Sequence, residues 1–152
     1  MNLFIFDLDE TLIDEDEKLI VSTDALNLLK ELYNTGEYEY GIASFNNYTE
    51  DILELLNIKY LFKYISSGIL LPDRDIHPYT YSKIDNVIHI MNISGREYEN
   101  IIFFDNNLDN CKHIRDYLKI PYIHVKGGVN YKNITESLDI VDSKKYKKIF
   151  EN

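Results

Sequence analysis

The sequence predicts an α/β fold, with a central parallel sheet and helices on both of its faces. Three observations lead to this class. Short runs of consecutive apolar residues recur along the chain, as in strands buried on both faces. Segments with apolar residues at helical spacing separate these runs. Several runs end directly in polar residues, which is typical of strands whose carboxyl ends line a site.

The apolar runs predict five strands. The first, residues 3–6, leads straight into the acidic segment DLDE, and most of the later strands are preceded by a segment with a helical pattern. The later strands are expected at residues 40–43, 64–66, 101–104 and 122–125.

The segments between the strands carry amphipathic helical patterns with recognisable ends. Ser22 or Thr23 can cap the first helix and Gly36 can end it, while Thr49 can cap the second. Pro121 marks the exit from the fourth helix. The helices are expected over residues 23–33, 49–56, 81–91 and 108–118, with a weaker one from about residue 133.

The chain has 152 residues, and a single domain over residues 1–152 is expected. Its net charge of −10 argues against a nucleic-acid partner held through phosphates. The single cysteine, Cys111, excludes an intramolecular disulfide and suits a reducing compartment. No apolar run approaches the roughly 20 residues of a membrane span, and the first strand begins too early for a signal peptide. We therefore expect a cytoplasmic protein without a membrane partner.

Two acids follow the first strand, which is unusual because burying an unpaired carboxylate is costly. Asp7 and Asp9 stand two residues apart, so strand alternation would point them to the same side. Ser44 follows the second strand, and Asp105 and Asn106 follow a later one. Because parallel strands share a carboxyl edge, these side chains can meet there, as in a metal or reaction site.

The segments DLDET, ASFN and FFDNN, with Lys83 near a helix start, occur in this order along most of the chain. The ordered set resembles the four motifs of the haloacid dehalogenase (HAD) superfamily of phosphatases. The resemblance implies a Rossmann-like HAD fold. The matching residues are Asp7, Asp9 and Thr11 in the first motif, Ser44 in the second, Lys83 in the third, and Asp105 with Asn106 in the fourth.

The segments RDIHPYTYSK, NIIFFDNN and IPYIHVKGGVN are similar to the capless magnesium-dependent phosphatase-1 branch of that superfamily. The intervals 11–44 and 44–83 are filled by the expected helices, strands and loops, which leaves no room for a cap domain. The resemblance implies that the partner is a phosphorylated protein of the phosphotyrosine type, or a small phosphate ester such as a sugar phosphate.

The resemblance also implies a Mg²⁺-dependent phosphomonoesterase that forms an aspartyl-phosphate. Asp7 would be the nucleophile, Asp9 the general acid and base, and Lys83 the cation that neutralises the transferring group. Mg²⁺ would be held by Asp7, the carbonyl of Asp9, and the pair Asp105 and Asn106. Substrate contacts would come from Thr11, Ser44, Phe45 and Asn46.

The fourth motif departs from the common form of the family, which often has two acids there. An amide oxygen can still bind Mg²⁺, although with less charge, and the small C-terminal-domain phosphatases resemble this Asp–Asn form. We expect Asn106 to be the direct ligand and Asp105 to lie behind it. The reverse holds if the loop turns one residue earlier.

Each of these residues also has a structural interpretation that the sequence leaves open. Asp7 and Asp9 can be turn residues, Thr11 can cap a local turn, and Asp105 can cap the following helix. Lys63 competes with Lys83 for the third motif. Further open positions are Ser44, Asn106 and Asn107 as loop residues, Asp109 as an acidic partner, and Asn46, Asn47 and Arg74 as surface or substrate-contacting residues.

The remaining polar residues show no spacing typical of a ligand set. We expect structural roles for the four histidines and a buried apolar environment for Cys111. The lysines of residues 144–148 are expected to form a solvated tail.

Two functions compete with turnover. One is a phosphate-accepting or regulatory binding module of HAD-like fold, and the other is a catalytically silent homologue. A phosphate-accepting receiver domain lacks a second acid two residues after the phosphorylated one. The presence of Asp9 therefore favours an enzyme.

Overall fold

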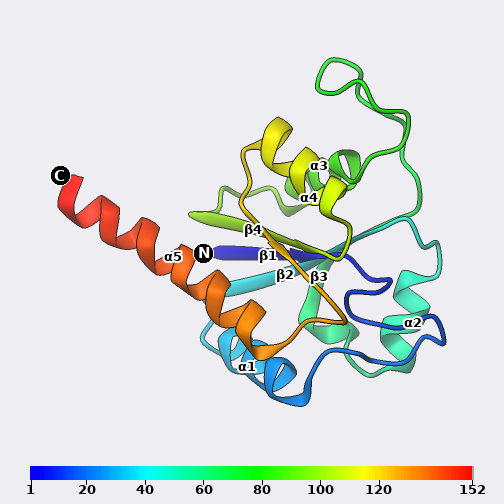
Figure 1. Ribbon diagram of the computed structural model, residues 1–152, viewed down its shortest axis with the longest axis horizontal. Helices are drawn as coiled ribbons and strands as arrows, with labels where there is room; N and C mark the ends of the chain where they lie inside the picture. The colour runs from blue at the N-terminus through cyan, green and yellow to red at the C-terminus, as the bar shows by residue number, and fades with distance from the viewer. Residues whose placement is uncertain (152) are drawn as a thin grey trace.

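The fold is organised around one parallel sheet whose strands follow the order β3-β2-β1-β4-β5 (Figure 1). The computed structural model describes residues 1–151, with side chains described through Ser143, so the expected solvated tail at 144–148 lies outside the described side chains. The sequence-based prediction of a parallel sheet is confirmed. The strands are β1 (Asn2–Phe6), β2 (Tyr38–Ser44), β3 (Phe62–Ser67), β4 (Asn100–Asp105) and β5 (Tyr122–His124).

Helices cover both faces of this sheet (Figure 1). One face is covered by α1 (Thr23–Asn34) and α5 (Tyr131–Glu151), and the other by α3 (Lys83–Ser94) and α4 (Leu108–Leu118). The connection from β2 to β3 contains α2 (Thr49–Leu55) and a short 3₁₀ turn. This is a Rossmann-like α/β arrangement, and residues 1–151 contain no separate cap domain. None of the helices described combines the length and apolar character needed to cross a membrane.

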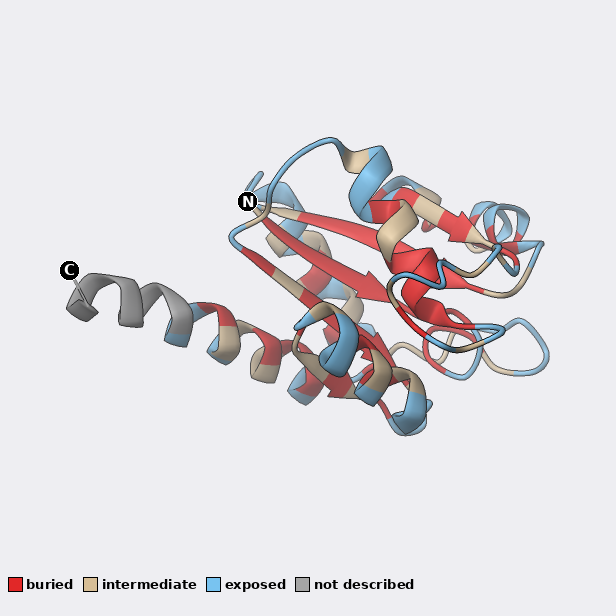
Figure 2. Cartoon of the chain, turned by 90° about the horizontal axis from the view of Figure 1, so that it is seen from above, coloured by how far each residue is buried: buried red, intermediate tan, exposed pale blue. Residues whose placement is uncertain are grey.

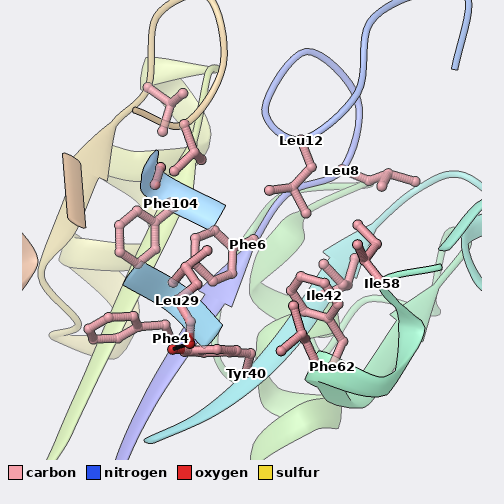
Figure 3. Packing of buried hydrophobic residues seen from close by; sticks show 14 of the residues in the cluster. Phe4, Phe6, Leu8, Leu12, Leu29, Tyr40, Ile42, Ile58, Phe62 and Phe104 are labelled. Atoms are coloured by element: carbon pink, nitrogen blue, oxygen red, sulfur yellow. Dashed lines mark hydrogen bonds between the residues drawn. The ribbon is translucent and has the colours of Figure 1, made fainter. Parts of the chain in front are cut away.

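The consecutive apolar residues of β1 face opposite sides, and both sides are buried. Phe4 and Phe6 pack in the cluster beneath α1 and α5, whereas Leu3 and Ile5 pack beneath α3 and α4. The rings of Phe6 and Phe104 stack with centroids 4.4 Å apart (Figure 3). The central strand β1 is completely buried and the other strands mostly so, while exposed residues lie mainly on loops and outer helix faces (Figure 2).

The central place of β1 decides where the polar strand ends lie. Phe6 pairs in register with Ile42 of β2 on one side and with Phe104 of β4 on the other. The residues at or just after the carboxyl ends of these three strands therefore lie side by side at one edge of the sheet. Asp7 is the middle one, with Ser44 and Asp105 on its two sides.

Several element boundaries differ from those the sequence predicts. Thr49 does not cap α2: Tyr48 occupies the cap position without a side-chain bond, and the Thr49 hydroxyl donates to the carbonyl of Asn46 at 2.7 Å. The helix expected from residue 81 begins at Lys83, because the Ser82 hydroxyl accepts the N–H of Ile84 and so sets the start. The last helix begins at Tyr131, two residues earlier than expected.

Gly128 joins the end of the sheet to the segment after the first motif, and we predict that it tolerates no side chain. Its φ is +97°, and a Cβ there would lie 2.3 Å from the carbonyl oxygen of Ile20. Gly128→Ala should therefore lower the free energy of unfolding by about 2 kcal/mol or more, measured by urea denaturation.

Gly127 is the matched control, because its φ is also positive, +69°, but no atom lies within 4 Å of its virtual Cβ. Gly127→Ala should cost only the backbone strain, roughly 1 kcal/mol. Equal losses in the two variants would show that the contact with Ile20 is not the reason for the glycine.

Candidate active site

Asp7 is the centre of the polar cluster at the carboxyl edge of the sheet. It is only 6% exposed, and its backbone N–H donates to the carbonyl of Phe104 at 2.8 Å, which fixes it beside β4. Its Oδ1 lies 2.5 Å from the ammonium of Lys83, and its Oδ2 accepts from the Thr11 hydroxyl at 3.1 Å. The carboxylate is thus buried but partnered on both oxygens, as a buried charge requires.

The chain turns sharply after Asp7, and this turn separates the two acids of the first motif. The carbonyl of Leu8 accepts the N–H groups of Thr11, Leu12 and Ile13, while the Leu8 side chain enters the core. Asp9 is exposed at the site, and the nearest polar side chain is the amide of Asn46, 3.4–3.5 Å from its carboxylate. One acid is therefore held and the other is free to exchange a proton with solvent.

Lys83 is the cation of the site. It is the first residue of α3, is 4% exposed, and donates to the carbonyl of Ala43 at 2.9 Å in addition to Asp7. Its ammonium lies 3.7 Å from Oδ2 of Asp105 and 5.1 Å from the ring centroid of Phe45. Lys63, the sequence-based competitor, instead pairs with Glu39 at 2.8 Å.

The end of β2 and the segment that follows it lie beside Asp9 and Lys83, but the Ser44 hydroxyl is more enclosed than a substrate contact requires. Ser44 is fully buried, and its Oγ accepts the backbone N–H of Asn46 at 3.0 Å. Phe45 is half-buried against Lys83, and the Asn46 amide faces Asp9. Of the expected substrate contacts in this segment, Phe45 and Asn46 are accessible and Ser44 lies beneath them.

Thr11 does not lie where the sequence analysis expects a substrate contact. Its side chain is fully buried, and its hydroxyl donates to Asp7 while accepting the backbone N–H of Asn106 at 3.2 Å. These bonds join the first motif to the fourth. The physical reason is the turn after Asp7, in which the Leu8 carbonyl accepts the N–H of Thr11 and folds it back beneath the acids.

Asp105 lies fully buried behind Asp7. Burial, together with the nearby charge of Asp7, raises the pKa of Asp105 to about 7. Its Oδ1 accepts the N–H of Asn107 at 2.9 Å and its Oδ2 accepts from the Asn110 amide at 3.1 Å. Asp105 is not the cap of α4, because Asn107 holds that position and accepts the N–H of Asn110.

The side-chain amide of Asn106 faces a group of oxygens. One of its two terminal atoms lies 3.0 Å from Oδ2 of Asp7, 3.2 Å from the carbonyl oxygen of Asp9 and 3.1 Å from Oδ1 of Asp105. All three neighbours are acceptors, so the nitrogen satisfies them in the protein alone. If the amide is turned so that its oxygen occupies this position, four oxygens lie close together, and a bound cation would be needed to offset their repulsion.

This set of oxygens fits a small hard cation. Neighbouring ligands of octahedral Mg²⁺ are about 2.9 Å apart, since the metal–oxygen distance is about 2.0–2.1 Å. The separations of Asn106 from Asp7 and from the Asp9 carbonyl are close to this value. The described residues contain no group of three or more His, Cys, Asp or Glu side chains suited to a metal, so the candidate set depends on an amide and a backbone carbonyl.

The residues whose roles the sequence leaves open lie either on the surface or in structural contacts. Asp109 and Asn47 are exposed, and Arg74 donates to the carbonyl of Pro78 at 2.6 Å. Burial and the charge of Asp105 raise the pKa of the Cys111 thiol to about 12, so it stays protonated. The histidines make structural contacts: His77 with Asp85, His89 with Ser66, His113 with the ring of Tyr79, and His124 with the carbonyl of Asn106.

The sequence does not predict that Asn110 and His124 contact residues of the site. Asn110 donates to Asp105 from the first turn of α4, and His124 contacts the Asn106 carbonyl at 3.0 Å. The signal for His124 was its position at the end of the last strand, which adjoins β4. Asn110 had no comparable signal, because its contact depends on where α4 begins.

Comparisons with known proteins agree with this arrangement. The sequence profile of the Acid Phosphatase family matches residues 13–144, a span that contains Ser44, Lys83, Asp105 and Asn106. A search of curated proteins gives no match.

Several solved structures share the fold at low sequence identity. A haloacid dehalogenase-like hydrolase from Streptococcus pneumoniae superposes with a TM-score of 0.62 at 12% identity, over 91% of this chain and 97% of that one. The core domain of a phosphoglycolate phosphatase candidate from the same species gives 0.60 at 15% identity, over 91% and 95%. A phosphatase candidate from Clostridium difficile gives 0.56 at 18% identity, over 79% and 53%.

The family profile covers most of the chain, and the fold and the ordered strand-end residues agree with it. The chain belongs to the acid phosphatase family, within the HAD superfamily of phosphatases.

Proposed function

We propose that this phosphatase is a Mg²⁺-dependent phosphomonoesterase that works through an aspartyl-phosphate on Asp7, and that it represents the capless branch of the superfamily. The observation that carries the proposal is the pair of unlike acids at the end of β1. Asp7 is buried against Lys83, and Asp9 is exposed two residues later. A held nucleophile beside a solvent-accessible acid is what a two-step phosphoryl transfer requires.

The chemistry follows from these positions. An oxygen of Asp7 attacks the phosphorus, the bond from phosphorus to the ester oxygen breaks, and Asp9 gives a proton to the leaving oxygen. Asp9, now a carboxylate, then takes a proton from a water molecule, which attacks the phosphorus and releases phosphate and Asp7. Lys83 neutralises charge on the transferring phosphoryl group. Its ammonium already contacts Asp7, so it lies next to the oxygen that attacks.

The proposed metal ligands are Asp7 Oδ2, the carbonyl of Asp9 and Oδ1 of Asn106. When bound, Mg²⁺ supplies positive charge that reduces the repulsion between the carboxylate and the phosphate. Asp105 is the weaker candidate, because its side chain has no exposed surface, whereas that of Asp7 is 8% exposed. We assign it the role of orienting Lys83 and the Asn106 segment.

The surroundings of the site favour a protein substrate with an aromatic phosphate ester. Gly68, after β3, donates to the carbonyl of Ser44 at 2.8 Å, which ties together the loops that follow β2 and β3. Large apolar side chains stand exposed on these loops and before α3, namely Tyr48, Ile69, Leu71 and Tyr81. Leu71 is 94% exposed, so this apolar rim is open to the body of a large substrate.

The first test is hydrolysis of p-nitrophenyl phosphate with and without Mg²⁺. Activity that requires the metal supports the proposal. Absence of turnover under both conditions, with folded protein, would instead favour a phosphate-accepting module or a silent homologue.

The two acids should have different mutant phenotypes. Asp7→Asn should abolish turnover and leave the fold intact, because the amide cannot attack phosphorus. Asp9→Asn should slow turnover and let the phosphorylated enzyme accumulate, which mass spectrometry of the quenched reaction would detect. Turnover of Asp7→Asn at the wild-type rate would refute the nucleophile assignment.

The metal ligands can be separated by magnesium titration of activity. Asn106→Ala should raise the Mg²⁺ concentration for half-maximal activity by roughly 10-fold or more, as losses of metal contacts typically do. Asn106→Asp should retain the metal, since it keeps an oxygen in place. If Asn106→Ala titrates like wild type while Asp105→Ala loses the metal, the direct ligand is Asp105.

The apolar rim should favour phosphotyrosine peptides over sugar phosphates. Leu71→Ser should lower kcat/KM for a phosphotyrosine peptide several-fold relative to kcat/KM for glucose 6-phosphate, because one buried leucine contributes about 1.5–3 kcal/mol. Ile93→Ser is the matched control, an exposed apolar residue near the far end of α3. A strong preference of the wild type for sugar phosphates, without peptide activity, would reject the protein substrate but not the phosphatase.

A further inference from the structure

A buried histidine lies in the loop before α3, outside the reacting cluster. The side chain of His77 is completely inaccessible, and its Nε2 lies 3.0 Å from both carboxylate oxygens of Asp85. Its Nδ1 accepts the backbone N–H of Tyr79 at 3.1 Å. Because Nδ1 is the acceptor, Nε2 carries the hydrogen and donates it to Asp85.

Asp85 joins this loop to the first turn of α3. Besides His77, its Oδ1 accepts the backbone N–H of Asp73 at 3.1 Å, so one carboxylate holds the loop at two points. The carbonyl of Asp73 in turn accepts the N–H of His77 at 3.2 Å. Hydrogen bonds therefore hold the loop both to itself and to α3.

The outer side of the loop is fixed against α4. The ring of Tyr79 stacks on His113 with centroids 4.0 Å apart and planes at 17°, and it meets Tyr117 edge-on at 5.6 Å. His77 also stacks on Tyr79, at 5.7 Å. The His77–Asp85 pair is thus enclosed between α3, α4 and the loop.

Lys83 stands between the two fixed points of the first turn. Ser82, before it, caps the helix, and Asp85, two residues after it, is bonded to the loop. The Lys83 ammonium must reach Asp7 at 2.5 Å and the Ala43 carbonyl at 2.9 Å from this backbone position. A shift of the turn would move the ammonium off Asp7.

We propose that His77 and Asp85 are positioning residues, whose hydrogen bond fixes the first turn of α3 and thereby holds Lys83 against Asp7. This rests on the proposed role of Lys83 in phosphoryl transfer. Neither residue touches the reacting atoms. A buried hydrogen-bonded pair gives directional restraint that an apolar contact of equal volume lacks.

The test compares three variants. His77→Phe keeps the aromatic ring next to Tyr79 but removes both hydrogen bonds, and kcat on p-nitrophenyl phosphate should fall about 10-fold or more, as expected for a misplaced catalytic group. His77→Gln can restore an N–H toward Asp85 and should recover most of the activity. Tyr40→Phe, which removes a buried hydrogen bond to the Leu29 carbonyl in the opposite layer, should leave kcat unchanged.

A double-mutant cycle tests whether His77 affects turnover through Lys83. In a Lys83→Met background, His77→Phe should change the residual rate less than two-fold, because the group it positions is gone. An undiminished 10-fold loss in that background would overturn the proposal, as would a loss in His77→Phe no greater than that in Tyr40→Phe.

A readout independent of turnover separates this inference from the proposed function. The ammonium of Lys83, held by Asp7, should give a slowly exchanging ¹⁵N signal in wild type and in Tyr40→Phe. The signal should be lost in His77→Phe, and its persistence there would overturn the inference even if the enzyme proves inactive. Should His77→Phe not fold, Asp85→Leu provides the same comparison, because it keeps a similar side-chain volume and removes both oxygens that accept from His77.

Discussion

The buried ion pair of Asp7 and Lys83 is the constraint on which the rest of the site depends. Asp7 is 6% exposed and would be strongly destabilising without a partner. Its partner comes from the helix that follows the third strand, 76 positions later in the chain. The pair therefore forms only when α3 lies over the sheet and β1 stands at its centre. This order of strands also brings Ser44 and Asp105 to the two sides of Asp7.

Three aspartates at one sheet edge differ because their surroundings differ. Asp7 is buried and paired with a cation, Asp9 is exposed beyond a sharp turn, and Asp105 is buried behind them with its pKa raised to about 7. The turn after Asp7 creates the contrast between the first two, because it directs Leu8 into the core and Asp9 outward. These different surroundings are what the proposed roles of the three aspartates in attack, proton transfer and orientation require.

The sequence predicts the parallel strands well, because strands depend on local patterns. Most strands carry an apolar run, although β3 (FKYISS) has only a weak one, and the strand-end rule places Asp7, Ser44 and Asp105 at one edge of the sheet. The burial of Thr11 results from a turn that no sequence pattern announces, so the sequence leaves its role open between a local turn and a substrate contact. The His77–Asp85 pair was invisible, because a histidine and an acid eight residues apart become partners only through the path of the loop before α3.

The amide at Asn106 has an electrostatic explanation. Its terminal atom lies within 3.2 Å of oxygens from Asp7, Asp9 and Asp105, while Lys83 is the one lysine that contacts this group within the described residues. A carboxylate at this position would place a third acid against Asp7 and the buried Asp105, with a single ammonium to balance them. Like charges at such distances disfavour ionisation of one another. An amide avoids this cost and can present either nitrogen to the acceptors or oxygen to a cation. The amide in place of the family's second acid therefore avoids placing another negative charge next to Asp7 and the buried Asp105.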